Sequence, residues 1–262
     1  MLNKNQAIGV LDSGIGGLTV LKQTLSQMPN EKFVFIGDQE NMPYGPRTKE
    51  DVTNLTRKLV QFLISKNVKA IVFACNTATA EAMEEIQREV QIPLLGVIKP
   101  GSSAAVANTK KRLGIIATEG TIKSQSYKQE IWKLNSDMVI YDKATPTLVP
   151  MIESGIIDES IISRELQYFK DKNIESIVLG CTHYPIIREE ISGFFDDKVK
   201  IIDPSYNTAE KLIEVLTENN MLGNQRQSVD FYTTADSNSF DQAITRILGI
   251  NNPQSLEVNL SD

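Results

Sequence analysis

The chain has 262 residues, 41% of them hydrophobic, which is enough for one large globular domain or two smaller ones. The 27 basic and 33 acidic residues give a net charge of −6 without a basic stripe, so nucleic acid is not expected as a partner. No signal peptide is evident and the apolar runs are too short to span a bilayer, so we expect a cytoplasmic protein that does not enter a membrane.

Short apolar strands alternate with amphipathic helices through the first part of the chain. Apolar residues recur at helical spacing from Leu18 to Met28, from Val52 to Phe62 and from Met83 to Val90. Around these helices the sequence predicts strands at residues 7–11, 33–37, 70–74 and 93–97. Such alternation is typical of parallel βαβ units.

The alternation then begins again. Strands are predicted at residues 113–117, 138–141, 177–180 and 199–202, with helices through Ile131 and Leu134 and through residues 161–169. After Ser205 the sequence predicts a long helix, a strand at 229–233 and a last helix at 240–248, which we expect to add to one of the two parts. The polar tail at 251–262 is expected to be loosely held.

Matched residues in the two parts indicate a duplication. Four pairs lie at offsets of 104 to 106 residues: Ile8 with Leu113, Gly9 with Gly114, Asp38 with Asp142, and Cys75 with Cys181. Short apolar strands resemble one another by chance, but here order and spacing agree as well. The chain is therefore predicted to be an α/β protein of two similar domains with parallel sheets, made of residues 1–97 plus 208–262 and of residues 98–207.

The chain has two cysteines, Cys75 and Cys181, and each follows a predicted strand and precedes a predicted helix. Ligands of parallel α/β folds bind at the carboxyl ends of the strands, and a helix N-terminus favours the reactive thiolate. A free cysteine is often only a packed core residue, but two at matching positions favour a catalytic role. If the two sheet edges face each other, the thiols meet across one cleft.

The segment Asp12-Ser13-Gly14-Ile15-Gly16-Gly17 follows the first predicted strand. It lacks the third glycine of the dinucleotide fingerprint, because Thr19 stands there, and no P-loop lysine follows. We interpret it as a tight turn that binds an anion such as a carboxylate, with Ser13 as a donor. Asp12 would instead accept a proton or hold an ammonium group. Alternatively, one of the two residues caps the following helix.

Other polar residues stand beside the cysteines. Asn76, Thr77 and Thr182 are suited either to cap helices or to orient a polar ligand. His183 stands two residues after Cys181 and is suited to act as the base that ionises that thiol. Cys75, Cys181, His183 and Asp12 offer metal-binding atoms, but no metal-ligand spacing supports a site, so no metal is expected.

Tyr44 and Gly45 lie in a polar loop, residues 39–48, that is longer than a turn requires. Such loops often carry functional residues. The alternative is a surface turn shaped by Pro43 and Pro46.

Five motifs together resemble glutamate racemases of the aspartate/glutamate racemase family. They are Asp-Ser-Gly-Ile-Gly-Gly (12–17), Pro-Tyr-Gly (43–45), Ala-Cys-Asn-Thr-Ala (74–78), Ala-Thr-Glu-Gly-Thr (117–121) and Gly-Cys-Thr-His-Tyr-Pro (180–185). The resemblance implies a cofactor-independent enzyme with its active site in the cleft between two similar domains. It implies Cys75 and Cys181 as the two acid/base residues, which act on opposite faces of the substrate α-carbon.

The resemblance also implies roles for the neighbouring residues. Asp12 and His183 would assist the nearer thiol, and Glu153 would support the second one. Ligand-binding positions fall on Asp12, Ser13, Tyr44, Gly45, Asn76, Thr77, Thr121, Thr182 and His183. The implied substrate is glutamate, the implied product D-glutamate for peptidoglycan, and the implied assembly a homodimer.

Other functions remain open on the sequence alone. No single arginine marks a pocket for a side-chain carboxylate, so a racemase for another amino acid such as aspartate is an alternative. A second alternative is an additional, non-catalytic protein-binding role. A hydrolase that uses Cys181 and His183 would leave Cys75 without a function.

Overall fold

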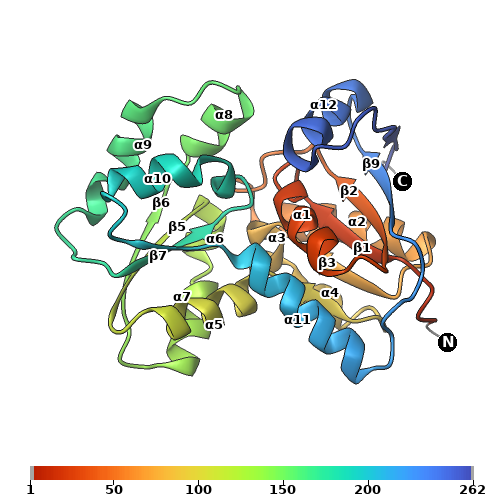
Figure 1. Cartoon of the computed structure of the whole chain (residues 1–262), viewed down its shortest axis with the longest axis horizontal. Coiled ribbons are helices and arrows are strands. Elements are labelled where there is room, and N and C mark those ends of the chain that lie inside the picture. Colours follow the sequence, from red (N-terminus) through yellow and green to blue (C-terminus); the bar gives the residue numbers. More distant parts are fainter. Residues whose placement is uncertain (1–2, 261–262) are drawn as a thin grey trace.

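The computed structural model describes residues 3–260, and they form two lobes, each built on one parallel sheet (Figure 1). The strands of the larger lobe are β1 (Ile8–Asp12), β2 (Lys32–Gly37), β3 (Ala70–Phe73), β4 (Leu94–Gly96), β9 (Ser228–Thr233) and β10 (Leu256–Glu257). Those of the smaller lobe are β5 (Arg112–Ala117), β6 (Val139–Ala144), β7 (Ser176–Gly180) and β8 (Lys200–Ile202). The strand orders are β10-β9-β2-β1-β3-β4 and β6-β5-β7-β8. This confirms the predicted α/β class with two parallel sheets.

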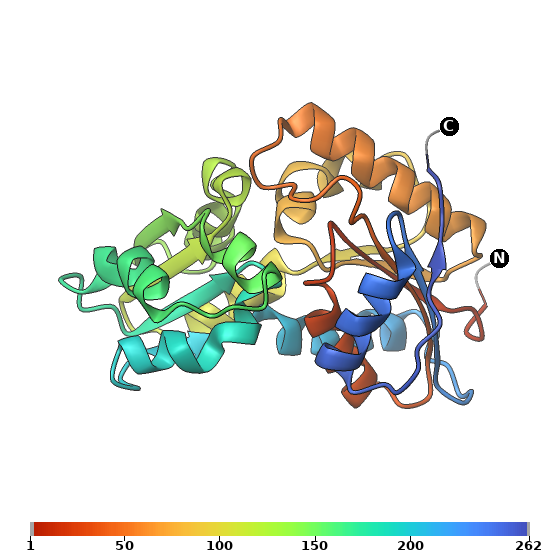
Figure 2. The same cartoon turned by 90° about the horizontal axis from the view of Figure 1, so that it is seen from above.

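Helices cover both faces of each sheet. Around the larger sheet lie α1 (Leu18–Gln27), α2 (Lys49–Ser65), α3 (Asn76–Glu81), α4 (Met83–Gln87), α11 (Pro204–Glu218) and α12 (Ser237–Leu248). The smaller lobe has α5 (Ile98–Asn108), α6 (Glu119–Lys123), α7 (Ser126–Leu134), α8 (Leu148–Glu153), α9 (Glu159–Leu166), α10 (Arg188–Phe194) and the 3-10 helices η1 (Gln167–Phe169) and η2 (Tyr184–Ile187). Seen from above, α2 and α12 lie on opposite sides of the larger sheet (Figure 2). No helix within residues 3–260 is long and apolar enough to cross a membrane.

The central strands are buried on both faces, as parallel strands covered by helices require. In β1, Val10 packs with the side chains of α1, α11 and α12, whereas Leu11 packs on the opposite face with those of α2. Both residues are fully buried. This double burial explains why these strands appear in the sequence as continuous apolar runs.

The strand orders confirm the duplication. The set β2-β1-β3-β4 has the same order as β6-β5-β7-β8. Gly9 pairs with Ile71 between β1 and β3, and Gly114 pairs with Ile177 between β5 and β7. Gly9 and Gly114 are 105 residues apart, and Ile71 and Ile177 are 106 residues apart. These are the offsets predicted from the matched glycines and the matched cysteines.

The predicted match of Asp38 with Asp142 is wrong. Gly37 pairs with Asp12, and Ala144 pairs with Ala117 at the equivalent point of the smaller sheet. The equivalent of Asp38 is therefore Thr145, because the connection between β5 and β6 is two residues longer than that between β1 and β2. Asp142 lies within β6, where Lys128 binds it at 2.8 Å.

Helix α5 was not predicted. Its sequence, Ile-Lys-Pro-Gly-Ser-Ser-Ala-Ala-Val-Ala-Asn, has few large apolar residues and so gives a weak helical period. Pro100 lies in the first turn, where a helix tolerates proline. A Cβ on Gly101 would lie 2.9 Å from Pro204, so the small residue allows α5 to approach α11.

The C-terminal part adds to the larger lobe, because β9 pairs with β2. The tail is better ordered than predicted, since β10 pairs with β9 and the Ser255 amide donates to Asp241. Residues 261–262 lie outside the described residues. Helix α11 packs against α1 of the larger lobe and α5 of the smaller one, and the predicted boundary at 207/208 falls within it.

A buried ion pair lies at the end of the larger sheet that is farther from Cys75. Lys69 stands just before β3 and is 0% exposed, and its Nζ lies 2.6 Å from Glu31 Oε2. The same Nζ donates to the carbonyls of Lys4 and Met221. The pair therefore joins the N-terminal segment to the α11–β9 connection.

We expect Lys69→Met to lower the free energy of unfolding by about 3–5 kcal/mol, because it leaves the Glu31 carboxylate buried without a counter-charge. Urea unfolding measures the change. Glu84→Gln is the control, since it breaks the exposed pair of Glu84 with Arg88 and should change stability little. A loss below about 1 kcal/mol for Lys69→Met would show that water or another group replaces the lysine.

Candidate active site

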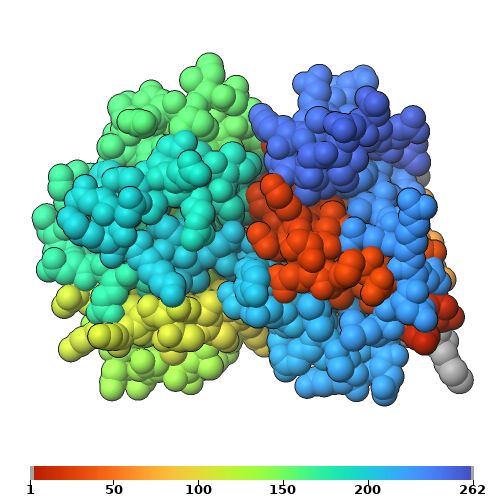
Figure 3. All heavy atoms as spheres, viewed as in Figure 1, coloured from red at the N-terminus to blue at the C-terminus, as the bar shows by residue number. Residues whose placement is uncertain are grey.

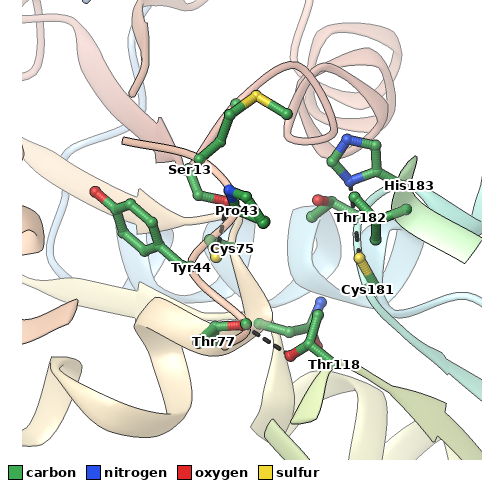
Figure 4. A pocket seen from close by; sticks show the side chains of 14 residues that line it. Ser13, Pro43, Tyr44, Cys75, Thr77, Thr118, Cys181, Thr182 and His183 are labelled. Carbon is green, nitrogen blue, oxygen red and sulfur yellow. Dashed lines mark hydrogen bonds between the residues drawn. The ribbon is translucent and has the colours of Figure 1, made fainter. Parts of the chain in front are cut away.

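One pocket lies where the carboxyl ends of the strands of both lobes meet (Figure 4). It is lined by Ser13, Gly14, Met42, Pro43, Tyr44, Gly45, Cys75, Asn76, Thr77, Thr118, Val149, Cys181, Thr182 and His183. Cys75 and Cys181 face it from opposite sides (Figure 4). The cavity measures about 30 Å³, which suits a water molecule or two, so a ligand as large as an amino acid requires the cleft to open.

Cys75 follows β3 and is the N-cap residue of α3, as predicted. Its Sγ accepts a hydrogen bond from the Ala78 amide at 3.4 Å, and the thiol donates to Ser13 Oγ at 3.5 Å. Burial, followed by the negative charge of Asp12, raises the pKa of the Cys75 thiol to about 12. In this closed cleft Cys75 therefore keeps its proton at neutral pH, and burial outweighs the helix N-terminus that we expected to favour the thiolate.

Cys181 follows β7, but it does not stand at a helix N-terminus as predicted. Residues 181–183 form a turn, and the 3-10 helix η2 begins only at Tyr184. The group beside this thiol is the imidazole of His183 and not a helix N-terminus: its Nδ1 lies 3.7 Å from Cys181 Sγ. Its Nε2 forms a short hydrogen bond with Glu153 Oε1. The predicted set of Cys181, His183 and Glu153 is thus brought together as one chain of contacts.

His183 is held in a charged environment despite its burial. Burial by itself lowers the pKa of the imidazole, but the contacts with Cys181 and Glu153 outweigh it and raise this pKa to about 10. At neutral pH the ring is therefore an imidazolium that can supply a proton beside Cys181. Glu153 fixes the ring through Nε2, which leaves Nδ1 directed at the sulfur.

Asp12 lies behind the pocket and does not line it. The carboxylate is fully buried, accepts from the Gly14 amide at 3.1 Å and accepts from Thr182 Oγ1 at 3.4 Å. Burial raises the pKa of Asp12 to about 6, although the charge of His183 opposes the shift. Asp12 therefore joins the turn before α1 to the segment after Cys181, and it reaches a ligand only through Thr182 in this closed form.

Tyr44 and Gly45 line the pocket, as predicted, but the tyrosine hydroxyl points away from it (Figure 4). The hydroxyl donates to Asp38 at 2.5 Å, and Thr234 donates to the same carboxylate at 2.8 Å. Only the ring and the backbone of Tyr44 therefore face the ligand space. The Gly45 carbonyl accepts from the Gly120 amide of the other lobe at 2.9 Å.

Three threonine hydroxyls meet between the lobes. Thr77 Oγ1 lies 2.9 Å from Thr118 Oγ1, which lies 3.0 Å from Thr121 Oγ1. Thr121 is buried behind Thr118, which lines the pocket in its place. Thr118 is not among the residues predicted from the sequence, yet the 105-residue offset pointed to it, because it is the counterpart of Ser13. No comparable signal marks Met42 or Val149, whose apolar side chains come from a loop and a short helix.

Asn76, Thr77 and Thr182 were predicted to cap helices or to orient a ligand. The thiol of Cys75, not Asn76 or Thr77, caps α3, and Thr182 Oγ1 donates to Asp12. All three line the pocket, which favours the ligand-orienting alternative. Within residues 3–260, no cluster of three or more His, Cys, Asp or Glu side chains is suited to hold a metal ion.

Comparison with known proteins identifies relatives along almost the whole chain. Residues 8–212 match the family model described as Asp/Glu/hydantoin racemase. A glutamate racemase of Lactobacillus johnsonii is 42% identical over 248 residues, which cover 92% of this chain and 93% of the relative. The crystal structure of a Francisella tularensis glutamate racemase in complex with D-glutamate superposes with a TM-score of 0.92 at 37% identity, covering 98% of this chain and 99% of that one. A Bacillus anthracis glutamate racemase also gives 0.92, at 35% identity, covering 99% of this chain and 98% of that one.

We expect Gly16→Ala to destabilise the protein by roughly 1–3 kcal/mol, because a methyl group there overpacks the contact between the lobes. A Cβ on Gly16 would lie 2.3 Å from Thr182 Oγ1 and 2.6 Å from His183 Nδ1. Thermal unfolding measures the effect. Gly193→Ala in α10 is the matched control: its Cβ meets nothing within 4 Å, so this variant should be neutral or more stable. Equal stabilities for the two variants would contradict the close contact.

The raised pKa of His183 predicts a dependence of stability on pH. The pKa of His183 is about 10 in the folded protein, against an ordinary value of 6.5. The stabilisation that comes from protonating the ring is therefore complete below pH 6.5 and is lost as the pH rises to about 10. The difference in unfolding free energy between the wild type and His183→Gln should therefore shrink from about pH 6.5 to about pH 10. Urea unfolding across that range tests it, and a constant difference would show that the ring is neutral.

Proposed function

We propose that this chain, which belongs to the Asp/Glu/hydantoin racemase family and racemises glutamate, uses Cys75 and Cys181 as two opposed acid/base groups. One observation carries the proposal. Two thiols from equivalent strand ends of duplicated lobes face one pocket from opposite sides (Figure 4). Racemisation requires such a pair, because a proton leaves one face of the α-carbon and another arrives on the opposite face.

The chemistry balances with two thiols alone. A thiolate on one side takes the α-proton and becomes a thiol, and the electron pair of the broken C–H bond spreads into the α-carboxylate. The thiol on the other side then delivers its proton to the α-carbon and becomes a thiolate. The product has the opposite configuration, and the two sulfurs have exchanged protonation states, so the reverse reaction can follow.

The neighbouring groups suit this cycle. The proton that Cys75 keeps in the closed cleft makes it the acid in one direction, and His183 can take up or return a proton at Cys181. Developing charge on the carboxylate needs hydrogen-bond donors already in position. Ser13, Asn76 and Thr77 line the pocket and are the donors we assign to that task, whereas Thr182 lines the pocket with its hydroxyl donating to Asp12. Asp12, Thr121 and Glu153 hold other pocket residues from behind.

The wider role follows from the family resemblance. We propose that the product, D-glutamate, supplies peptidoglycan synthesis in the cytoplasm, that the chain forms a homodimer, and that it divides into domains at residues 97/98 and 207/208. The two separate sheets support the division. The relatives named above are all glutamate racemases, which supports glutamate as the substrate of this chain.

The two-thiol mechanism is tested by following L-glutamate in heavy water without added cofactor. The wild type should form D-glutamate with deuterium at the α-carbon, and Cys75→Ser and Cys181→Ser should each lower racemisation by roughly 100-fold to 10,000-fold. Each lost thiol removes the acid or base of one face. L-Aspartate under the same conditions tests side-chain specificity and should react far more slowly.

Circular dichroism and thermal unfolding of both variants provide the control for folding. Racemisation within about tenfold of wild type in both folded variants would rule out the opposed thiols. Loss of activity in only one of them would point to a single base that serves both faces.

A further inference from the structure

We propose that Tyr127 is a positioning residue that spans the two lobes and fixes the side-chain amide of Asn76 for the ligand. This inference rests on the proposed function, because Asn76 is one of the donors assigned there to the substrate carboxylate. Tyr127 does not line the pocket and touches no reacting atom. It acts through the residue that follows Cys75.

Tyr127 connects the ends of both cysteine-bearing strands. It stands in the first turn of α7 in the smaller lobe, and it is 3% exposed. Its ring lies against Gly180, the residue before Cys181, since a Cβ on that glycine would lie 3.4 Å from Tyr127 Cε2. Its hydroxyl crosses to the larger lobe and donates to Asn76 Oδ1 at 2.8 Å. One side chain thus contacts the neighbours of both thiols.

The hydroxyl determines which way the Asn76 amide faces. Burial, with the charges of Asp203 and Cys181, raises the pKa of Tyr127 far above its usual range, so the phenol stays protonated and can donate. With Oδ1 occupied by this donor, Asn76 presents its NH2 group to the pocket. Within residues 3–260, no protein acceptor takes a hydrogen bond from that NH2 group. A carboxylate ligand needs a donor there, because a flipped amide would present an oxygen and repel it.

The counterpart of Asn76 is held across the lobes in the same way. At the offset of 106 residues this counterpart is Thr182, which follows Cys181. Thr182 donates to Asp12, and its carbonyl accepts from Thr19 Oγ1 at 2.9 Å; both partners belong to the opposite lobe. Each polar residue after a cysteine is therefore positioned by the opposite lobe, and Tyr127 performs this for Asn76. Closure of the cleft and orientation of these two polar residues then occur together.

The test is a double-mutant cycle with Tyr127→Phe and Asn76→Ala. Tyr127→Phe keeps the ring and removes the hydroxyl, so we expect kcat/KM for glutamate to fall about tenfold, and the Kd of D-glutamate by calorimetry to rise by a similar factor. If Tyr127 acts through Asn76, the same change in the Asn76→Ala background should alter both values less than about twofold. A merely structural tyrosine would give additive effects.

Two further variants keep the test decisive. Tyr141→Phe removes a phenol from β6 of the same lobe, at a half-buried tyrosine that does not line the pocket, and should leave kcat/KM unchanged. Tyr127→Met replaces Tyr127→Phe in the cycle if the latter does not fold. Wild-type kinetics in either single variant, or additive losses in the double variant, would overturn the proposal. Absence of racemisation in the wild type would instead refute the proposed function, and calorimetry of ligand binding still reads out the role of Tyr127.

Discussion

The close approach of the two lobes at the carboxyl ends of their strands governs the rest of this structure. Glycines make it sterically possible: a methyl group on Gly16 would overlap Thr182 and His183, and one on Gly45 would lie 2.9 Å from Thr118. Hydrogen bonds then join the lobes: neutral ones run from Gly120 to Gly45 and from Thr19 to Thr182, and one from Thr182 ends on the Asp12 carboxylate. None of the ion pairs among residues 3–260 connects one lobe to the other. Because each of these bonds contributes only about 1–3 kcal/mol, the seam is weak enough for the cleft to open for an amino acid and close again. On the face shown in Figure 3, α1 meets the smaller lobe along this seam.

Closure also sets the protonation of the site, since it removes water from three ionisable groups at once. Burial favours neutral forms, and it raises the pKa values of Cys75 and Asp12. His183 escapes this rule because Glu153 and Cys181 contact both of its ring nitrogens. The result is an asymmetric pair: Cys75 keeps its proton, whereas Cys181 lies beside the His183 imidazolium. A two-base reaction begins from such a difference.

The duplication supplies the symmetry of this arrangement, and local substitutions supply the asymmetry. The cysteines, Ser13 with Thr118, and Asn76 with Thr182 occupy equivalent places at offsets of 105 or 106 residues. His183, by contrast, is the counterpart of Thr77, so only the smaller lobe has an imidazole beside its thiol. Asp12 is the counterpart of Ala117, so only the larger lobe has a buried carboxylate there. Two similar halves thus present chemically different faces to one ligand.

The sequence by itself determined the α/β class, the duplication, the two cysteines and most of the residues that line the pocket. It could do so because buried parallel strands leave continuous apolar runs, and because polar residues follow them where ligands bind. It did not determine α5, whose small residues give only a weak helical period, or the equivalence of Asp38 with Thr145, which depends on strand register. Only the tertiary structure decided that Asp12 lies behind the pocket, that the Tyr44 hydroxyl turns away from it, and that Tyr127 reaches Asn76. These contacts join residues 6 to 170 positions apart, and their geometry depends on how the lobes and loops pack, which no local pattern records.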